Sequence, residues 1–284
     1  MTSIFQSASV PSGRKQNIST ICAAIGEQKV LAFRNKLSNT IKMKITNKKI
    51  LVTGGATGIG FALAERFIND GNTVITCGRR EEALNEAKAK LPSLITKVCD
   101  LSIDTDRESL FRWISENHND LNILVNNAGI QQWMTITDPN FFQRAKQEIT
   151  INIEAPVHLT FLFQNLPSLT TIMNVTSGLS FVPLTKTPVY SGTKAFFHSF
   201  TLSLRHLLKT KNIEVIEIIP PALNTDLGGK GIHDFAPPVS GFIESIFEQL
   251  EKGKNELTYG FTEQVSKAGS EILNTSFNKV NQIN

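Results

Sequence analysis

Three polar side chains in the second half of the sequence have the types and spacing of a proton-transfer site. Tyr190 and Lys194 are four residues apart, so they share one face of a helix, and Ser177 precedes the tyrosine by thirteen residues. A phenol with an ordinary pKa of about 10 is a poor acid and a poor base near neutral pH. A neighbouring ammonium stabilises the phenolate, so we expect Lys194 to lower the pKa of Tyr190. The pattern indicates proton delivery to a carbonyl oxygen that Ser177 orients and polarises.

A nucleotide-binding turn is indicated near residue 54. The stretch KKILVTGGATGIG runs from an apolar segment into glycines, and the amphipathic FALAERFIND follows it, which predicts a strand, a tight turn and a helix. Gly54 permits the turn, Gly58 lets a diphosphate approach the main chain, and Gly60 allows close helix packing. An ordinary glycine turn is the alternative, but the flanking strand and helix are the context that the motif requires.

Four motifs in this order resemble the short-chain dehydrogenase/reductase family. They are TGGATGIG, NNAG at Asn126–Gly129, Ser177, and YSGTK at Tyr190–Lys194, and the resemblance covers roughly residues 45 to 260. The segment IIPPALNTDL is also similar to a bacterial oxidoreductase subgroup called DltE-like. The sequence departs from the family at Pro220 and Pro221, where a Pro-Gly pair is usual, and this alters the expected wall beside the nicotinamide.

The resemblance implies a catalytic set of four residues. Tyr190 is the general acid and base, Ser177 binds the substrate oxygen, and Lys194 also binds the nicotinamide ribose. Asn152, in ITINIEAP, corresponds to the helix asparagine that holds a proton-relay water.

The resemblance also implies which residues bind the dinucleotide. Asp100 and Leu101 border the adenine, the NNAG segment lines the adenosine half, and Thr225 contacts the carboxamide. Asn126 has the alternative role of bracing neighbouring strands. The predicted cofactor-binding residues are Gly54, Thr57, Gly58, Ile59, Gly60, Arg79, Arg80, Asp100, Leu101, Asn127, Ala128, Gly129, Tyr190, Lys194 and Thr225.

The end of the second predicted strand favours NADP(H) over NAD(H). An acid at this place hydrogen-bonds the ribose 2′-hydroxyl of NAD, whereas cations accommodate a 2′-phosphate. The segment TCGRR has no acid and two arginines, Arg79 and Arg80, which can hold a phosphate by charge-assisted hydrogen bonds. The alternative is that they are solvated charges at a helix start, neutralised by Glu81 and Glu82.

The residues that follow the motifs suggest a substrate site. We interpret LGGKGIHDFAPP, within residues 222–240, as a mobile lid, with an ordinary surface loop as the alternative. Most of the candidate pocket residues are apolar, which favours a neutral aldehyde or ketone as the small-molecule substrate. These candidates are Gln131, Trp133, Leu179, Val182 and Leu223.

Strand and helix patterns alternate along residues 43–284, which predicts an α/β fold with a doubly wound parallel sheet, the Rossmann fold, as a single domain. One long helix is expected over 139–164, another over 190–209, and a C-terminal helix over 262–284. The segments PVHLTFLF and KAFFHSFTLSLRHLL are apolar on several sides, so each needs more than one buried face. This indicates a homodimer or homotetramer, which the family resemblance also implies.

Residues 1–42 form a basic extension with six Lys or Arg and one Glu, leaving 23 basic and 24 acidic residues in the remainder. The domain itself therefore has no positive excess, which argues against nucleic-acid binding. The extension resembles an organelle transit peptide in part, and the other interpretation is that the native chain begins at Met43; we expect it to be disordered in either case.

No run of apolar residues reaches membrane-spanning length, so we expect no membrane segment. The three scattered cysteines, Cys22, Cys77 and Cys99, lack metal-site spacing and favour a reducing compartment such as the cytoplasm, with organelle import if the transit peptide is genuine. We predict no metal site.

Two other functions remain alternatives to a carbonyl reductase. A redox sensor would hold NADP(H) without catalysis, but sensing needs no proton donor. An epimerase or dehydratase would share the fold and the tyrosine, yet such chains generally carry a longer C-terminal substrate domain, and only about sixty residues follow Pro221.

Overall fold

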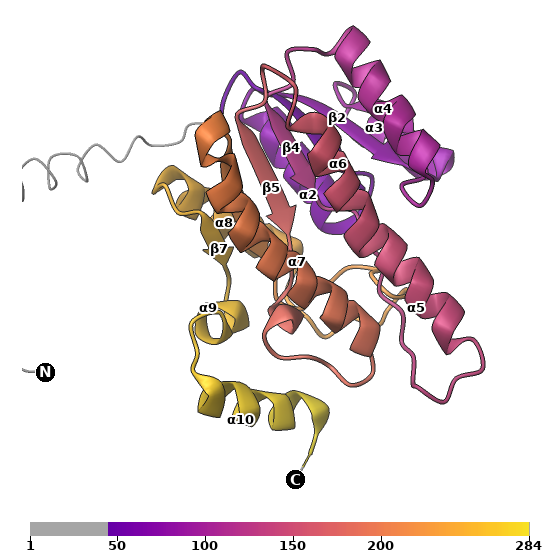
Figure 1. Ribbon diagram of the computed structural model, residues 1–284, viewed down its shortest axis with the longest axis vertical. Helices are drawn as coiled ribbons and strands as arrows, with labels where there is room; N and C mark the ends of the chain where they lie inside the picture. The colour runs from indigo at the N-terminus through magenta and orange to yellow at the C-terminus, as the bar shows by residue number, and fades with distance from the viewer. Residues whose placement is uncertain (1–44, 284) are drawn as a thin grey trace, which may run out of the picture. The chain divides into compact units, whose positions relative to one another are not determined.

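A seven-stranded parallel sheet forms the centre of residues 45–283, the part of the chain described by the computed structural model (Figure 1). The strand order is β3-β2-β1-β4-β5-β6-β7, and each neighbouring pair is parallel. This confirms the predicted doubly wound α/β fold. The strands are β1 (Lys49–Thr53), β2 (Thr73–Gly78), β3 (Ile95–Val98), β4 (Ile123–Asn126), β5 (Thr171–Val175), β6 (Glu214–Ile219) and β7 (Glu256–Thr258). The basic extension, residues 1–42, lies outside the described residues.

Helices cover both faces of the sheet. Helices α2 and α8 pack on one face, whereas α4, α6 and α7 contribute apolar side chains to the core on the other face. The helices are α2 (Gly58–Asn69), α3 (Glu81–Lys90), α4 (Asp104–Asn117), α5 (Phe141–Ile149), α6 (Ala155–Phe163), α7 (Pro188–Leu207), α8 (Val239–Glu251), α9 (Phe261–Val265) and α10 (Ser270–Asn281). Short 3₁₀ turns follow β5 at Gly178–Ser180 and α7 at Leu208–Lys211.

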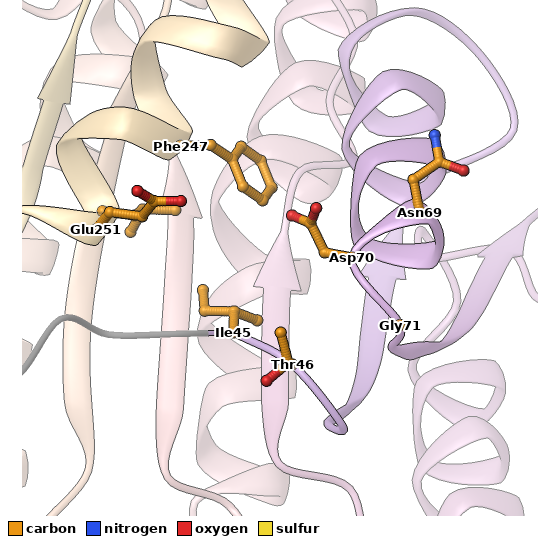
Figure 2. Close-up of a pocket in the computed structure, with 8 residues that line it drawn as sticks. Ile45, Thr46, Asn69, Asp70, Gly71, Phe247 and Glu251 are labelled. Atoms are coloured by element: carbon orange, nitrogen blue, oxygen red, sulfur yellow. The ribbon is translucent and has the colours of Figure 1, made fainter.

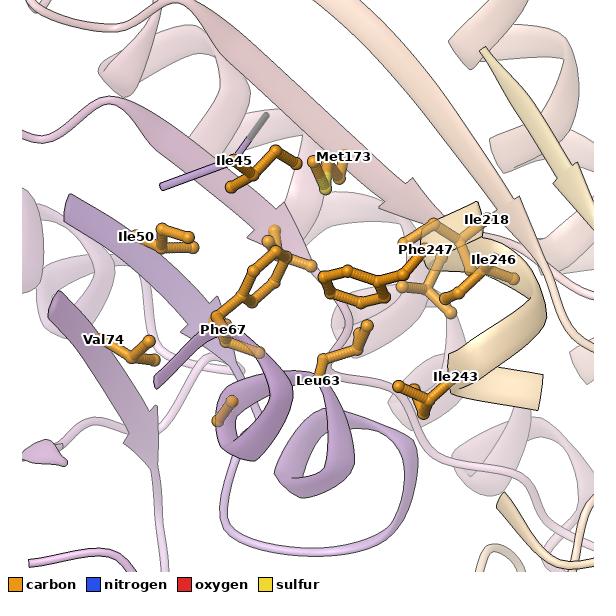
Figure 3. Packing of buried hydrophobic residues seen from close by; sticks show 14 of the residues in the cluster. Ile45, Ile50, Leu63, Phe67, Val74, Met173, Ile218, Ile243, Ile246 and Phe247 are labelled. Carbon is orange, nitrogen blue, oxygen red and sulfur yellow. The ribbon is translucent and has the colours of Figure 1, made fainter. Parts of the chain in front are cut away.

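The core explains why the central strands read as continuous apolar runs. In β1, Ile50 belongs to the core on one face and Leu51 to the core on the other, and both are fully buried. On the first face, Phe67 of α2 meets Phe247 of α8 with ring centroids 5.1 Å apart (Figure 3). Packing on both faces leaves the carboxyl edge of the sheet, where the strands end, to carry polar residues.

The chain order reverses between β1 and β4, which are hydrogen-bonded neighbours. In folds of this kind the connections after two such strands leave in opposite directions, and ligands bind outside the carboxyl ends of the strands at this point. Gly54 follows β1, Asn127 follows β4, and Ser177 follows β5 by one intervening residue. The sequence motifs therefore meet at one edge.

The helix predicted over 139–164 is interrupted. A π-helical turn, Thr150–Glu154, separates α5 from α6, and the amide of Ala155 donates to the carbonyl of Thr150, five residues earlier. Pro156 lacks an N–H group, so it cannot donate to the carbonyl of Asn152 four residues earlier, and the regular α-helical ladder fails there. The interruption places Asn152 in the widened turn.

The C-terminal region also differs from the single helix predicted over 262–284. Helix α9 ends at Val265, and α10 begins only at Ser270, because Gly269 before it has extended backbone angles. No side chain of α10 is buried, so its periodicity does not mark a core face. In the segment before α9, the structure also contains α8 and β7, which the sequence pattern did not predict.

The structure of residues 45–283 contains no helix long and apolar enough to cross a membrane. Among the same residues, no group of three or more His, Cys, Asp or Glu side chains is arranged to hold a metal ion.

Candidate active site

The structure brings Ser177, Tyr190 and Lys194 together at the carboxyl edge of the sheet. Ser177 begins the 3₁₀ turn after β5, where its Oγ accepts a hydrogen bond from the amide of Leu179 at 3.1 Å. Tyr190 lies in the first turn of α7, whose start is favoured by Pro188, because proline has helical φ and needs no amide partner there. All three side chains are buried: Ser177 is 8% exposed, Tyr190 5% and Lys194 4%.

Lys194 is fixed by the strand that precedes Ser177. Its Nζ donates to the carbonyl oxygen of Val175 at 2.8 Å and lies 5.7 Å from the centroid of the Tyr190 ring. Burial penalises the ammonium form and lowers the pKa of Lys194 to about 8.

The pKa of Tyr190 corrects one expectation drawn from the spacing. We expected Lys194 to lower it, but burial raises the phenol pKa above its ordinary value, and only the nearby Ser177 hydroxyl acts in the opposite direction. The carboxylate of Glu148 raises it further. The physical reason is that the same burial that brings the ammonium near also removes water from the phenolate.

Asn152 joins the wall after β4 to α7. Its Oδ1 accepts from the amide of Ile130 at 2.9 Å, and its Nδ2 donates to the carbonyl of Ile130 at 2.9 Å and to Oγ1 of Thr193 at 3.1 Å. Thr193 Oγ1 in turn donates to the carbonyl of Tyr190 at 2.7 Å. The side chain of Asn152 therefore connects the loop after β4 to α7.

The glycine turn has the shape that the sequence predicted. Gly54 and Gly58 have φ angles of +66° and +56°, which favour glycine. A Cβ at Gly54 would lie 3.0 Å from Cα of Ala128, and one at Gly60 would lie 2.4 Å from the carbonyl oxygen of Gly54. The turn thus brings the start of α2 close to the segment after β4. Helix-start amides beside a glycine turn are suited to hold a diphosphate.

The NNAG segment is tied to this turn by a residue that the sequence analysis missed. Oγ1 of Thr53 accepts from the amides of Asn127 and Ala128, both at 3.0 Å, and Asn127 Nδ2 donates to the carbonyl of Thr53 at 2.9 Å. Thr53 is the last residue before the first glycine of the motif, and this position was the signal in the sequence that could have identified it. Asn126 instead donates to Oδ1 of Asn174 at 3.0 Å and braces β4 against β5, which was its alternative role.

Gly129, the last residue of the NNAG segment, lies close to Asn152 and Lys194. A Cβ there would lie 3.2 Å from Oδ1 of Asn152 and 3.7 Å from Nζ of Lys194. Glycine at this position keeps the space between the loop and Lys194 open.

The predicted charged residues lie after β2 and β3. Arg79 and Arg80 are exposed after β2, and within residues 45–283 neither side chain forms an ion pair. Burial acts to raise the pKa of Asp100, but hydrogen bonds from Ser102 and the charge of Arg79 together lower it. Leu101 is buried beside Asp100.

The loop after β6 returns over the loop after β4. Thr225 lies beside the glycine turn, with its Cγ2 3.5 Å from where a Cβ of Gly58 would be. Further along, Nε2 of His233 lies 3.3 Å from Oε1 of Gln131. Of the remaining pocket candidates, Trp133 is exposed and Leu179 half-buried, whereas the other two are buried in the interior. These two are Val182 and Leu223.

A cavity of about 440 Å³ lies away from this site (Figure 2). Its lining includes Ile45, which precedes β1, Asp70, at the end of α2, and Phe247, near the end of α8. These places are at the amino edge of the sheet, opposite the carboxyl edge that carries Tyr190. The cavity is therefore separate from the candidate active site.

Comparison with known proteins agrees with the fold and the motifs. The short chain dehydrogenase family matches residues 48–234. The chain is 43% identical over 229 residues to the uncharacterized oxidoreductase DltE of Bacillus subtilis, which spans 76% of this chain and 89% of the relative. It is 30% identical over 226 residues to serine 3-dehydrogenase of Rhizobium radiobacter, covering 74% and 82% of the two chains.

Solved structures share the fold at lower identity. A short chain dehydrogenase from Burkholderia cenocepacia, in complex with NADP, has a TM-score of 0.72 and 21% identity, with 83% of this chain and 99% of that chain covered. A short-chain dehydrogenase from Sphingobium yanoikuyae, in complex with NADPH, has a TM-score of 0.66 and 23% identity, with 74% and 87% covered. The chain belongs to the short-chain dehydrogenase/reductase family and is a DltE-like oxidoreductase.

Proposed function

We propose that this enzyme is an NADP(H)-dependent oxidoreductase that interconverts an aldehyde or ketone with the corresponding alcohol, with Tyr190 as general acid and base. The observation that carries the proposal is the burial of Ser177, Tyr190 and Lys194 together at the carboxyl edge of the sheet, beside the glycine turn. The bound nicotinamide supplies the hydride in reduction and accepts it in oxidation.

The chain's own residues manage the proton. In reduction, Ser177 donates a hydrogen bond to the substrate carbonyl oxygen, and Tyr190 transfers its phenolic proton to that oxygen as hydride reaches the carbon. Lys194 stabilises the resulting phenolate, which regains a proton from solvent, and we propose that Asn152 holds a water on that path. Oxidation runs the same transfers in reverse.

The proposal is tested by Tyr190→Phe, which removes only the ionisable hydroxyl. We expect turnover to fall by about 10²–10⁴-fold, the usual contribution of general acid–base catalysis, while NADPH affinity is retained. The matched control is Tyr259→Phe, because the chain has only two tyrosines and Tyr259 packs against Phe242 of α8. Near-native turnover by the Tyr190 variant would refute the role.

For the cofactor, we propose that Arg79 and Arg80 bind the 2′-phosphate. Their exposure and their freedom from ion pairs within residues 45–283 support this role. Replacing both with Ala should weaken NADPH binding and leave NADH binding nearly unchanged, as measured by fluorescence titration. If the wild type binds NADPH and NADH with equal affinity, and the double variant does the same, Arg79 and Arg80 do not bind the 2′-phosphate.

Apolar side chains near the site favour a neutral, partly hydrophobic carbonyl substrate, and we propose that the loop over residues 222–240 acts as its lid. A screen of aldehydes and ketones that follows NADPH consumption separates this function from the two others considered. A redox sensor consumes no NADPH, and an epimerase or dehydratase shows no net consumption.

The free thiols of Cys77 and Cys99 fit a reducing compartment, and we propose that the enzyme acts in the cytoplasm.

A further inference from the structure

A buried carboxyl group beside the candidate active site has no part in the proton transfer described above. Glu148 is fully buried on α5, and its Oε1 accepts a hydrogen bond from the amide of Gln132 at 2.5 Å. Its Oε2 is buried and has no hydrogen-bond partner in the described part of the chain. A buried carboxylate with an unpartnered oxygen is unfavourable, so its presence here calls for a functional reason.

Glu148 lies one turn before Asn152, and the two side chains act on the same loop. Asn152 binds both backbone groups of Ile130, and Glu148 binds the amide of Gln132, two residues further on. Between these attachment points, Gln131 reaches His233 in the loop over 222–240. The segment Ile130–Gln132 is therefore clamped to the helical stretch that contains α5 and the π-helical turn.

The same helix brings the carboxyl group toward the catalytic tyrosine. Helix α5 packs against α7, and the negative charge of Glu148 acts on the phenol of Tyr190. Burial raises the pKa of Glu148 to about 7, although the Gln132 amide and the charge of Arg144 oppose the rise. The charged and titratable groups on the surrounding elements are Arg144 on α5, Tyr190 and Lys194 on α7, and His233 in the lid loop.

We propose that Glu148 is a positioning residue of the active site: its buried carboxyl group clamps the loop after β4 to α5 and places a negative charge beside α7, the helix that carries Tyr190. When ionised, this carboxylate favours the protonated phenol of Tyr190. Reduction of a carbonyl requires that protonated form, whereas oxidation of an alcohol requires the phenolate. An ionised Glu148 thus favours the enzyme form that is competent for reduction. This consequence for the reaction rests on the proposed function, but the electrostatic coupling itself does not.

The coupling can be measured without substrate or cofactor, because the chain has only two tyrosines. In a Tyr259→Phe background, the ultraviolet absorbance of tyrosinate after a rapid pH jump, ahead of alkaline unfolding, reports Tyr190 alone. We expect Glu148→Gln to shift phenolate formation to lower pH, because the substitution removes the negative charge that disfavours the phenolate. Adding Tyr190→Phe should abolish the signal and so assign it.

The control is Glu214→Gln, which neutralises an exposed carboxyl at the start of β6, on the opposite edge of the sheet. It should leave the midpoint of Tyr190 unchanged. Glu148→Met is a second neutral variant that keeps the side-chain volume, so the test stands if Glu148→Gln does not fold. A midpoint that is unchanged or raised in the folded neutral variants overturns the proposal.

Kinetic measurements distinguish a failure of the role proposed for Glu148 from a failure of the proposed oxidoreductase function. In an active enzyme, Glu148→Gln should shift the pH profile of alcohol oxidation to lower pH. If no carbonyl is reduced by the wild type, the proposed function fails, while the tyrosinate titration still decides the coupling. If turnover is present but the tyrosinate midpoint does not move, only the role of Glu148 fails.

Discussion

At Gly54, both the backbone conformation and the nearby atoms exclude a side chain. Its φ angle is +66°, and a Cβ would lie 3.0 Å from the backbone of Ala128. We predict that Gly54→Ala weakens dinucleotide binding at least tenfold and lowers the free energy of unfolding by roughly 2–4 kcal/mol, because backbone strain and displacement of Ala128 add. Cofactor titration and urea unfolding measure the two effects.

Gly71 provides the matched control for this prediction. Its φ angle is +83°, but no atom lies within 4 Å of a Cβ placed there. Gly71→Ala should therefore cost only the left-handed strain of about 1–2 kcal/mol and leave cofactor affinity intact. Equal effects of the two substitutions would show that the close approach to Ala128 is unimportant.

The raised pKa of Glu148 also has a consequence for stability. The folded protein retains a proton that the unfolded chain loses near pH 4.5, so the free energy of unfolding should fall as pH rises from about 4.5 to 7. In Glu148→Gln this contribution is absent, so we predict a shallower decline over that window. Denaturant titrations at intervals across the window measure the difference, and parallel curves for the two proteins would contradict it.

At the scale of elements, a buried carboxylate holds α7 to the sheet. Glu217 of β6 accepts from Oγ1 of Thr176 at 2.7 Å and pairs with Nδ1 of His198 on α7 at 2.9 Å. Because removing one partner leaves the other groups unpaired, we predict that Glu217→Ala destabilises the fold by about 2–4 kcal/mol. Chemical unfolding gives the value, and a change below 1 kcal/mol would show that the cluster does not anchor α7.

This cluster should also make stability depend on pH. The hydrogen bond to Glu217 raises the pKa of His198 above its ordinary value of 6.5, although burial opposes the rise. The stabilisation by the charged pair is therefore full below about pH 6.5 and is lost as pH rises through the folded-state pKa. At alkaline pH the wild type should therefore lose the part of its stability advantage over Glu217→Ala that comes from the charged pair.

The control for Glu217→Ala is Glu256→Ala, which removes the half-exposed partner of Arg205. It should lower the free energy of unfolding by less than about 1 kcal/mol.

At the scale of the whole molecule, the apolar helices predict self-association. Phe161 on α6 is 62% exposed and Phe196 on α7 is 43% exposed, and both helices cover the same face of the sheet. Exposed aromatic side chains of this kind are typical of protein interfaces. We propose a homodimer or homotetramer that buries these residues.

We predict that Phe161→Lys combined with Phe196→Lys yields monomers, because each substitution places an ammonium in the apolar contact. Sedimentation velocity at micromolar concentration measures the change. The control is Ile103→Lys, an exposed apolar position before α4, which should leave the assembly intact. A wild-type protein that is already monomeric would contradict the assembly.

The sequence by itself determined the sheet, the glycine turn and the meeting of the motifs at one edge. These follow from local rules: apolar runs form strands covered on both faces, and glycines at 54 and 58 permit positive φ angles. The order of strands and helices then places the residues that follow the strands at their common carboxyl edge. For this reason Ser177, Tyr190 and Lys194 could be grouped before any coordinate was known.

Only the tertiary structure decided the electrostatics of that group. Spacing alone predicted that Lys194 lowers the pKa of Tyr190, but burial raises the pKa of Tyr190 and lowers that of Lys194, because removal of water disfavours both charged forms. The sequence does not single out Glu148, since nothing in its neighbours along the chain shows that it is buried on a helix that packs against α7. Desolvation depends on which atoms surround a group in space, and residues far apart in the sequence provide those atoms.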